Sequence, residues 1–212
     1  MHEQSYISVI TEAAKMYQKN LLDKNVMFIH FDKRKNIYNC TEMLFGKQNF
    51  MHLTGLDFVN SNEDNLKIEK RNAVLFYNKC INNKVSLRDI KENRNGWTPL
   101  KIDVIRILMN IHKNAKMIGK YNFSKPLLVS EKICGGVNAA MGISKDKNGI
   151  FFPQSGLKED IRKLVNRNEI EIIKVIMVKE REDRYYSDVT YGDLNSIYDK
   201  LSNEIKEKIK KN

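Results

Sequence analysis

The sequence predicts an α+β fold in which N-terminal helices and a hairpin are followed by an antiparallel sheet of roughly four to five strands and a C-terminal helix. Three observations support this prediction. The first part of the chain contains both apolar residues at helical spacing and β-type runs. The middle contains short apolar runs separated by turn residues, and apolar residues recur at helical spacing after residue 193. No internal repeat is visible, so we expect residues 1–212 to form a single domain.

The first part of the chain is predicted to form a helix and a hairpin. Apolar residues recur at helical spacing over 5–20, which indicates an amphipathic helix. Two β-type runs, 26–31 and 37–45, flank a short polar turn and predict the hairpin. His30 lies inside the first of these strands, where we expect a packed histidine whose hydrogen bonds are satisfied.

Helices are expected before the sheet begins. The polar segment 61–70 is predicted to be a loop, and the spacing of 73–82 indicates a helix. A short helix with a hydroxyl cap is expected over 86–90. Thr98 followed by Pro99 has the order of a helix start, and helical spacing continues beyond it.

The central region is predicted to be an antiparallel meander. The segments between its apolar runs carry turn chemistry, most clearly Asn148-Gly149, because this pair accepts the positive φ of a tight hairpin turn. The runs are residues 115–121, 126–133, 137–144 and 150–152.

The last part of the chain is predicted to be mixed. Pro153–Gly156 leads into a short helix over 157–164, and 170–178, the most β-branched run, is expected to be a central strand. The polar segment 181–189 extends a hairpin, and an amphipathic helix follows from residue 193.

The chain is strongly basic, with 37 Lys and Arg against 26 Asp and Glu and a formal net charge of +11. The basic residues are spread along the sequence, which suits a nucleic-acid groove better than a disordered basic arm. A polyanionic partner is therefore expected. The three cysteines are far apart and form no Cys-x-x-Cys pair, so neither a disulfide framework nor a zinc ribbon is predicted.

Several classes of protein are disfavoured by missing motifs. There is no signal-peptide pattern, and no apolar run approaches the roughly 18 residues of a membrane span, so a cytoplasmic protein without a membrane partner is expected. The glycine-rich motifs that hold nucleotide phosphates are absent, as are His-Glu-x-x-His and aspartate-rich clusters. We therefore predict no cofactor and no metal ion.

The most site-like stretch is Asn49–Leu56, an apolar run that contains a histidine and a hydroxyl. If the run is extended, His52 and Thr54 point to the same face, which places two proton-handling groups side by side. The alternative is a half-buried histidine beside an ordinary Thr-Gly turn.

RNA can be cleaved without a metal ion. The 2′-hydroxyl attacks its own phosphate if a base removes its proton, a cation stabilises the added negative charge and an acid protonates the leaving oxygen. Each candidate also has a structural alternative, such as capping a helix or lining a solvated face. The candidates are His52, Thr54, His112, Lys113, Lys120, Tyr121, Ser155, Lys158 and Arg162.

Three segments, 49–56, 111–122 and 152–162, together resemble the phage-associated branch of the barnase, EndoU, colicin and RelE-like nucleases, and within it the fourth phage family. The resemblance covers about residues 20–180 as a nuclease-like core, with helical extensions at 1–20 and 193–212. It implies a barnase/RelE-like fold whose open sheet face binds and cleaves RNA without a metal, in a toxin or effector of a phage, prophage or mobile element.

The resemblance also implies roles for individual residues. His52 is the candidate general base or acid, and Thr54 orients it or binds phosphate. Lys158 and Arg162 are expected one turn apart on a helix face, where they hold the scissile phosphate. Tyr121 is the second proton donor or a base-stacking platform. The secondary candidates are the competing pair His112 and Lys113, with Lys120 and Ser155.

Two other functions stay open. The same sheet and charge suit a non-catalytic RNA- or protein-binding phage module, in which His52 is structural and buried. An enzyme instead needs His52 within about 10 Å of Lys158, Arg162 or Tyr121 in an open cleft. A third function is an interaction protein whose apolar stripe, Leu194–Ile209, docks an antitoxin or immunity protein unless it packs on its own core. The sequence predicts neither the oligomeric state nor the cleavage specificity.

Overall fold

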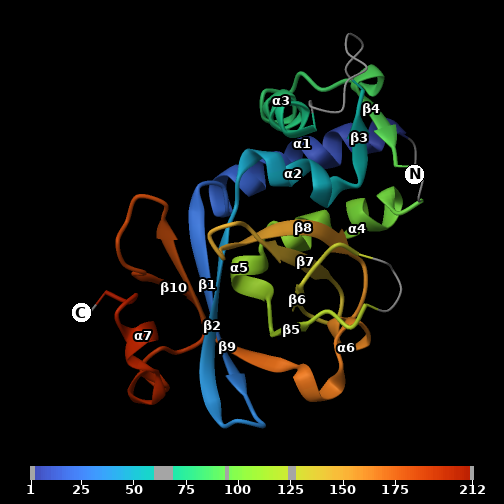
Figure 1. The fold of residues 1–212 in the computed structure, drawn as a ribbon. Helices are drawn as coiled ribbons and strands as arrows, with labels where there is room; N and C mark the ends of the chain where they lie inside the picture. Colours follow the sequence, from blue (N-terminus) through green and yellow to red (C-terminus); the bar gives the residue numbers. More distant parts are fainter. Residues whose placement is uncertain (1–2, 60–68, 94–95, 124–127, 211–212) are drawn as a thin grey trace.

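The computed structural model describes residues 3–59, 69–93, 96–123 and 128–210 (Figure 1). The predicted loop 61–70 lies almost wholly outside these residues, as does the start of the predicted strand 126–133. Over the ranges that are described, no helix is both long and apolar enough to cross a lipid bilayer.

Seven strands close into a mixed barrel in the order β1-β2-β8-β7-β6-β5-β9, and β9 pairs back to β1. Neighbouring strands are antiparallel except β2 and β8, which are parallel and pair at Met43 and Phe151. β10 is an extra strand beside β9. The strands are β1 (Lys24–Asp32), β2 (Ile37–Leu44), β5 (Met117–Lys120), β6 (Lys132–Gly135), β7 (Ala140–Lys145), β8 (Phe151–Leu157), β9 (Glu171–Glu180) and β10 (Asp188–Tyr191).

The barrel shows that the predicted fold class is wrong. The α+β prediction kept the N-terminal hairpin apart from an antiparallel sheet of roughly four to five strands, whereas the structure joins both in one closed sheet. The reason lies in β9, whose first residues, Glu171 and Ile172, pair with β5 on one edge while β1 pairs along the other. β9 thus joins the hairpin to the antiparallel strands, and the parallel pairing of β2 with β8 closes the sheet on itself.

Several of the individual strands lie where they are predicted. The hairpin is confirmed as β1 and β2, paired from Asn25 with Leu44 to Asp32 with Ile37, and the predicted central strand 170–178 is β9. The Asn148-Gly149 turn is confirmed between β7 and β8, with Gly149 at a φ of +81°. Short-range patterns therefore located these strands correctly.

β8 is longer than predicted and replaces both the expected segment 153–156 and the start of the expected helix 157–164. Pro153 lies opposite Ile143 at a register shift, where the missing N–H of proline is tolerated. Gly156 lets two helices approach the strand, because a Cβ there would lie 2.5 Å from Leu108 Cδ1 and 3.3 Å from the Leu53 carbonyl oxygen. Only α6 remains of the predicted helix.

The longer helices cover one side of the barrel. Figure 1 shows α1, α2, α3 and α4 grouped near β8, with α7 on the other side of the β1–β2 hairpin. The main core lies between these helices and the inner barrel face. The predicted short helix over 86–90 is a 3₁₀ turn, η2 (Leu87–Asp89), next to a separate two-stranded sheet of β3 (Leu56–Phe58) and β4 (Ile90–Glu92). The helices are α1 (Glu3–Asn20), α2 (Lys47–Thr54), α3 (Glu69–Ile81), α4 (Thr98–Leu108), α5 (Ile111–Asn114), α6 (Ile161–Leu164) and α7 (Asn203–Lys206).

The C-terminal segment is packed as an apolar stripe, but it is not the long helix expected from residue 193. Its backbone forms a 3₁₀ turn, η4 (Tyr198–Lys200), and then α7, which begins where the Ser202 side chain accepts a hydrogen bond from the Ile205 N–H. The stripe covers the outer face of β1 and β9. Its buried members are Ile197, Leu201, Ile205 and Ile209.

Candidate functional site

The predicted His52 stretch forms a helix and is not extended. α2 buries Phe50 and Leu53 at helical spacing and ends at Thr54, before Gly55, whose φ of +70° is the left-handed conformation common after a helix. In this helix His52 is exposed, whereas Thr54 is fully buried. The expectation that both side chains share one face is therefore wrong.

The Thr54 hydroxyl is engaged by the backbone around it. It donates a hydrogen bond to the Met51 carbonyl at 2.7 Å and accepts one from the Leu56 N–H at 3.1 Å. His52 instead borders two neighbouring pockets, and its carbonyl accepts a hydrogen bond from Lys101 at 3.1 Å. Of the two residues, only His52 faces a space that a ligand can enter.

Lys158 and Arg162 are both engaged in ion pairs. Lys158 Nζ lies 2.9 Å from a carboxylate oxygen of Asp103 on α4, and Arg162 lies 2.5 Å from Asp160, the residue that caps α6. Lys158 follows β8 and precedes α6, so the two basic residues do not lie one turn apart on a helix as predicted.

Tyr121 and Ser155 are buried residues. Tyr121 is 1% exposed, bridges Val165 through its backbone and packs in the small apolar cluster beneath α6. The structure thus brings Tyr121 close to the helix that carries Arg162, but Arg162 lies on the exposed side of that helix. Ser155 lies opposite Gly142 in the β7–β8 ladder.

His112 is buried in α5, and among the described residues its Nδ1 atom has no hydrogen-bond partner. Burial, aided by the nearby charge of Lys113, lowers the pKa of His112 to about 4, so the ring is neutral at neutral pH. Lys113 itself is exposed. Lys120 is exposed at the end of β5, opposite Lys132 in the β5–β6 ladder.

The predicted residues therefore lie on several separate elements. Lys120 lies opposite Lys132, which belongs to a polar cluster that the sequence does not predict. In this cluster, His30 Nδ1 lies 2.6 Å from Glu171 Oε2 and His30 Nε2 lies 2.9 Å from Thr41 Oγ1. Asn39 Nδ2 donates to the same Glu171 oxygen at 2.9 Å, and Lys132 Nζ donates to the Thr41 hydroxyl at 3.3 Å. We refer to these five residues as the His30 cluster.

Strand alternation brings the His30 cluster to the inner face of the barrel. His30 follows Phe28 on the inner face of β1, and Thr41 precedes Met43 on the inner face of β2. His30 and Thr41 are 1% and 2% exposed, whereas the Glu171 side chain is 23% exposed. The cluster thus has a buried histidine and a carboxylate that solvent can reach.

The ionisation of the cluster follows from its burial and hydrogen bonds. Burial lowers the pKa of His30 even though Glu171 opposes that shift, so His30 is neutral at neutral pH. Partial burial of Glu171 favours its neutral form, but hydrogen bonds from His30 and Asn39 outweigh this and lower the pKa of the carboxyl. Glu171 is therefore ionised, and the proton between the two residues belongs to His30 Nδ1.

One arrangement of protons satisfies every hydrogen bond in this network. Lys132 donates to the Thr41 oxygen, Thr41 donates to His30 Nε2, and His30 Nδ1 donates to Glu171. Burial also lowers the pKa of Lys132, which releases its proton more readily than a solvated lysine. A cation and a carboxylate are thus coupled through a buried hydroxyl and a buried imidazole.

Further positive charge surrounds the cluster. Lys132 Nζ and Lys145 Nζ each lie 5.2 Å from the centre of the Phe151 ring, so the two ammonium groups share one aromatic residue. Lys120 lies opposite Lys132 on the neighbouring strand. This concentration of charge favours a phosphate group next to the Glu171 carboxylate.

Sequence reasoning missed this site because its members come from four strands. The sequence predicts a packed His30 with satisfied hydrogen bonds, and the hydrogen bonds of its ring agree with that prediction. Glu171 opens a strand whose apolar run dominates the local pattern. The available signal is the alternation that turns Asn39 and Thr41 to the same buried face as Met43, since polar residues on a core face need partners.

A family model matches almost the whole chain. The family described as phage-Barnase-EndoU-ColicinE5/D-RelE like nuclease4 matches residues 9–212, and the resemblance to the fourth phage family is thereby confirmed. No curated protein and no solved structure matches the sequence. Across the described ranges, no three His, Cys, Asp or Glu side chains are grouped so that they could hold a metal ion.

Proposed function

The chain belongs to the phage-Barnase-EndoU-ColicinE5/D-RelE like nuclease4 family, and on this premise we propose that it is a metal-independent endoribonuclease whose catalytic centre is the His30 cluster. One observation carries the assignment. A partly exposed carboxylate, Glu171, and a lysine of lowered pKa, Lys132, are linked through buried His30 and Thr41. The arrangement supplies a base and a cation within one hydrogen-bonded network.

In the proposed reaction, the Glu171 carboxylate takes the proton of a ribose 2′-hydroxyl. The 2′-oxygen forms a bond to the adjacent phosphorus while the bond from phosphorus to the 5′-oxygen breaks, which leaves a 2′,3′-cyclic phosphate and a 5′-hydroxyl. Lys132 stabilises the negative charge that builds up on the phosphate, and its proton passes to the leaving 5′-oxygen. Lys120 and Lys145 add positive charge around the same phosphate.

His30 is a positioning residue in this scheme, because it is buried and acts through Glu171. Its Nδ1–H fixes the carboxylate and keeps it ionised, and its Nε2 orients the Thr41 hydroxyl that Lys132 contacts. Asn39 holds the carboxylate from a second direction. The lowered pKa leaves Glu171 a weak base, but one that is fully in its basic form at neutral pH.

The resemblance gave the base or acid role to His52 and the phosphate roles to Thr54, Lys158 and Arg162, with Tyr121 as the second donor. We propose a contact with substrate for His52, because it borders an open groove. Thr54 and Tyr121 are buried, and the two basic residues are paired with carboxylates. Binding of an antitoxin or immunity protein remains a prediction.

The test is cleavage of a mixed RNA pool that includes tRNA, in the presence of EDTA, by purified wild-type protein and the Glu171→Gln variant. A matched control is Glu182→Gln, which removes an equal charge at an exposed position beyond β9. We expect cleavage in EDTA by wild type and by the control, with cyclic phosphate ends, and loss of cleavage in Glu171→Gln. If wild type binds the RNA and leaves it intact, the non-catalytic binding module replaces this proposal.

A further inference from the structure

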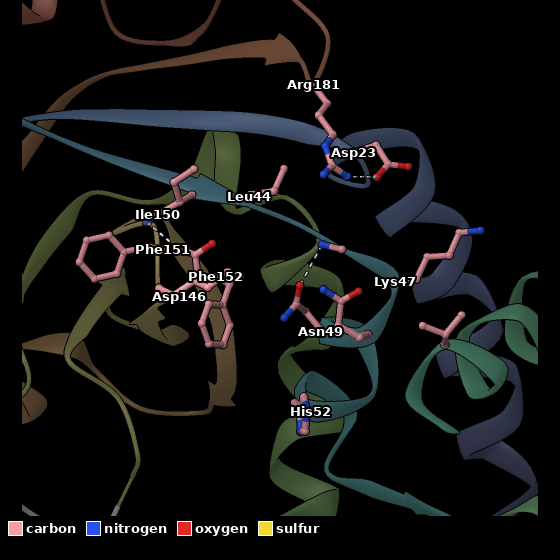
Figure 2. A pocket seen from close by; sticks show the side chains of 14 residues that line it. Asp23, Leu44, Lys47, Asn49, His52, Asp146, Ile150, Phe151, Phe152 and Arg181 are labelled. Carbon is pink, nitrogen blue, oxygen red and sulfur yellow. Dashed lines mark hydrogen bonds and ion pairs between the residues drawn. The ribbon is translucent and has the colours of Figure 1, made fainter. Parts of the chain in front are cut away.

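A pocket of about 640 Å³ lies outside the barrel, between α2, the turn at Asp23 that precedes β1, and the β7–β8 hairpin. Figure 2 shows its two sides, with Asn49 and His52 on α2 facing Ile150 and Phe152 from the hairpin. Arg181, which follows β9, lies at another border of the same space. We call this space the α2 groove.

More basic than acidic side chains line the α2 groove. Lys47, Lys147 and Arg181 line it together with His52. Its acidic residues are Asp23 and Asp146, and both carboxylates already have partners. Asp23 pairs with Arg181 at 3.8 Å, and Asp146 accepts hydrogen bonds from the backbone of its own hairpin turn.

Lys47 and Lys147 are the two exposed lysines that line the groove. Neither lysine forms an ion pair with any residue that the structure describes. Because an exposed lysine binds a phosphate as a flexible point charge, two of them on opposite sides of a groove suit a chain of phosphates better than one small anion.

Apolar surface lies between these charges. Phe152 is only partly buried and Ile150 is 37% exposed, and both line the groove. Proteins that bind single-stranded nucleic acid combine a basic groove for the backbone with aromatic side chains on which the bases stack. A duplex keeps its bases stacked inside, so this combination favours a single strand.

The β7–β8 hairpin joins the α2 groove to the His30 cluster. Lys145 lies over Phe151 beside the cluster, and Lys147, in the turn that follows, lines the groove. Phe151 also lines the groove while Lys132 lies over its ring. An RNA strand that leaves the cluster across this hairpin therefore meets Lys145 and then Lys147, while the Asp146 carboxylate between them is held by the backbone of its own turn.

We propose that the α2 groove binds the sugar-phosphate backbone and bases of single-stranded RNA next to the cleavage site. This proposal rests on the proposed function for the position of the scissile phosphate. Lys47 and Lys147 bind phosphates, Phe152 stacks on a base, and His52 contacts the RNA without taking part in the chemistry. The enzyme accordingly selects an unpaired stretch longer than the dinucleotide that is cleaved.

The test measures binding apart from cleavage. The probe is a labelled 2′-O-methyl RNA of about 12 nucleotides, a length within the site sizes of single-strand binding proteins, in which the attacking hydroxyl is blocked. Anisotropy titrations over a range of salt concentrations compare wild type with the double variant Lys47→Gln/Lys147→Gln. The matched control is Lys200→Gln/Lys210→Gln, which removes the same charge from exposed positions in the C-terminal segment.

We expect the groove variant to bind several-fold more weakly and its plot of log affinity against log salt to flatten by about 1.4, or about 0.7 for each lost phosphate contact. The control should keep the wild-type slope. Phe152→Ala should weaken binding by about tenfold, whereas Tyr185→Ala, an exposed aromatic outside the groove, should not. A duplex of the same length should bind less tightly than the single strand.

Equal binding by the groove variant and its control overturns this proposal, and so does a preference for the duplex. These outcomes do not depend on cleavage. If RNA is cleaved but the groove variants bind normally, only the groove assignment fails. If the groove binds RNA as expected but EDTA-resistant cleavage is absent, the catalytic proposal fails and the binding site remains.

Discussion

The Nδ1 atom of His30 lies 2.6 Å from Oε2 of Glu171, although the two residues are 141 positions apart in the sequence. The contact exists because β1 and β9 are neighbours in the closed barrel. It couples a buried imidazole to a carboxylate that solvent can reach, and the proposed chemistry depends on that coupling.

The His30 contact predicts the pH dependence of cleavage. The pKa of Glu171 lies below its ordinary value of 4.5, so kcat/KM should fall on the acid side only below that pH. Lys132 has a lowered pKa, so activity should be lost on the alkaline side before the ordinary lysine value of 10.5 is reached. A pH–rate profile of the wild-type protein measures both limits.

Replacing His30 should move the acid limit of this profile, which is the pH below which kcat/KM falls. His30→Ala removes the N–H that stabilises ionised Glu171, while the burial that favours the neutral carboxyl remains, so the limit should shift to higher pH. His30→Gln, which keeps an N–H donor, should shift it less. An unchanged acid limit in folded His30→Ala contradicts the positioning role.

Protein stability should depend on His112 in mild acid. Its pKa in the folded state is about 4, below the ordinary 6.5, so the unfolded chain binds more protons between these values. Neutral His112 therefore contributes at most about 3 kcal/mol to the free energy of unfolding. This contribution is fully present above about pH 6.5 and is lost as the pH falls toward 4. Urea unfolding of wild type and His112→Leu at about pH 7.5 and about pH 4.5 measures it.

The variant His112→Leu should lose less stability than wild type between the two pH values, because the acid-induced losses from other groups are common to both proteins. If wild type and His112→Leu show the same loss, burial of a neutral His112 is not the cause.

Gly119 should resist substitution for a local packing reason. A Cβ at this position would lie 2.8 Å from the Glu169 carbonyl oxygen, so Gly119→Ala must displace the backbone that leads into Glu171. We expect a loss of about 1–3 kcal/mol in the free energy of unfolding, together with reduced cleavage. Chemical denaturation measures the first effect.

Gly136 provides the matched control for Gly119. A Cβ there would meet no atom of the described residues within 4 Å, and the φ of Gly136 is not in the left-handed region that favours glycine. Gly136→Ala should therefore leave stability within about 0.5 kcal/mol of wild type. Equal effects of the two substitutions contradict the packing explanation.

Local patterns predict single elements of this protein better than they predict its closure. The β-branched run of β9 and the Asn148-Gly149 turn are visible in the sequence because strand and turn propensities act over a few residues. Closure depends on a single parallel register between Met43 and Phe151, and no short-range pattern indicates it. The predicted fold class is wrong for that reason.

The His52 stretch shows how an apolar run can be interpreted as a strand, with a period of two residues, when it forms a helix. Phe50 and Leu53 are three residues apart and share the buried face of α2, and Gly55 ends the helix. Both features favour a helix and were present in the sequence. The His30 cluster is different, because the β1–β2 hairpin brings together only residues 30, 39 and 41, and residues 132 and 171 join them from strands that are distant in the sequence.

The most direct test of the catalytic centre is the single-turnover cleavage rate at saturating protein, because this rate reports chemistry and not binding. We predict that Glu171→Gln lowers it by at least about 100-fold, while His52→Ala, measured beside it, stays within a few-fold of wild type. The opposite result, a normal rate in Glu171→Gln with cleavage abolished in folded His52→Ala, would contradict the assignment to the His30 cluster.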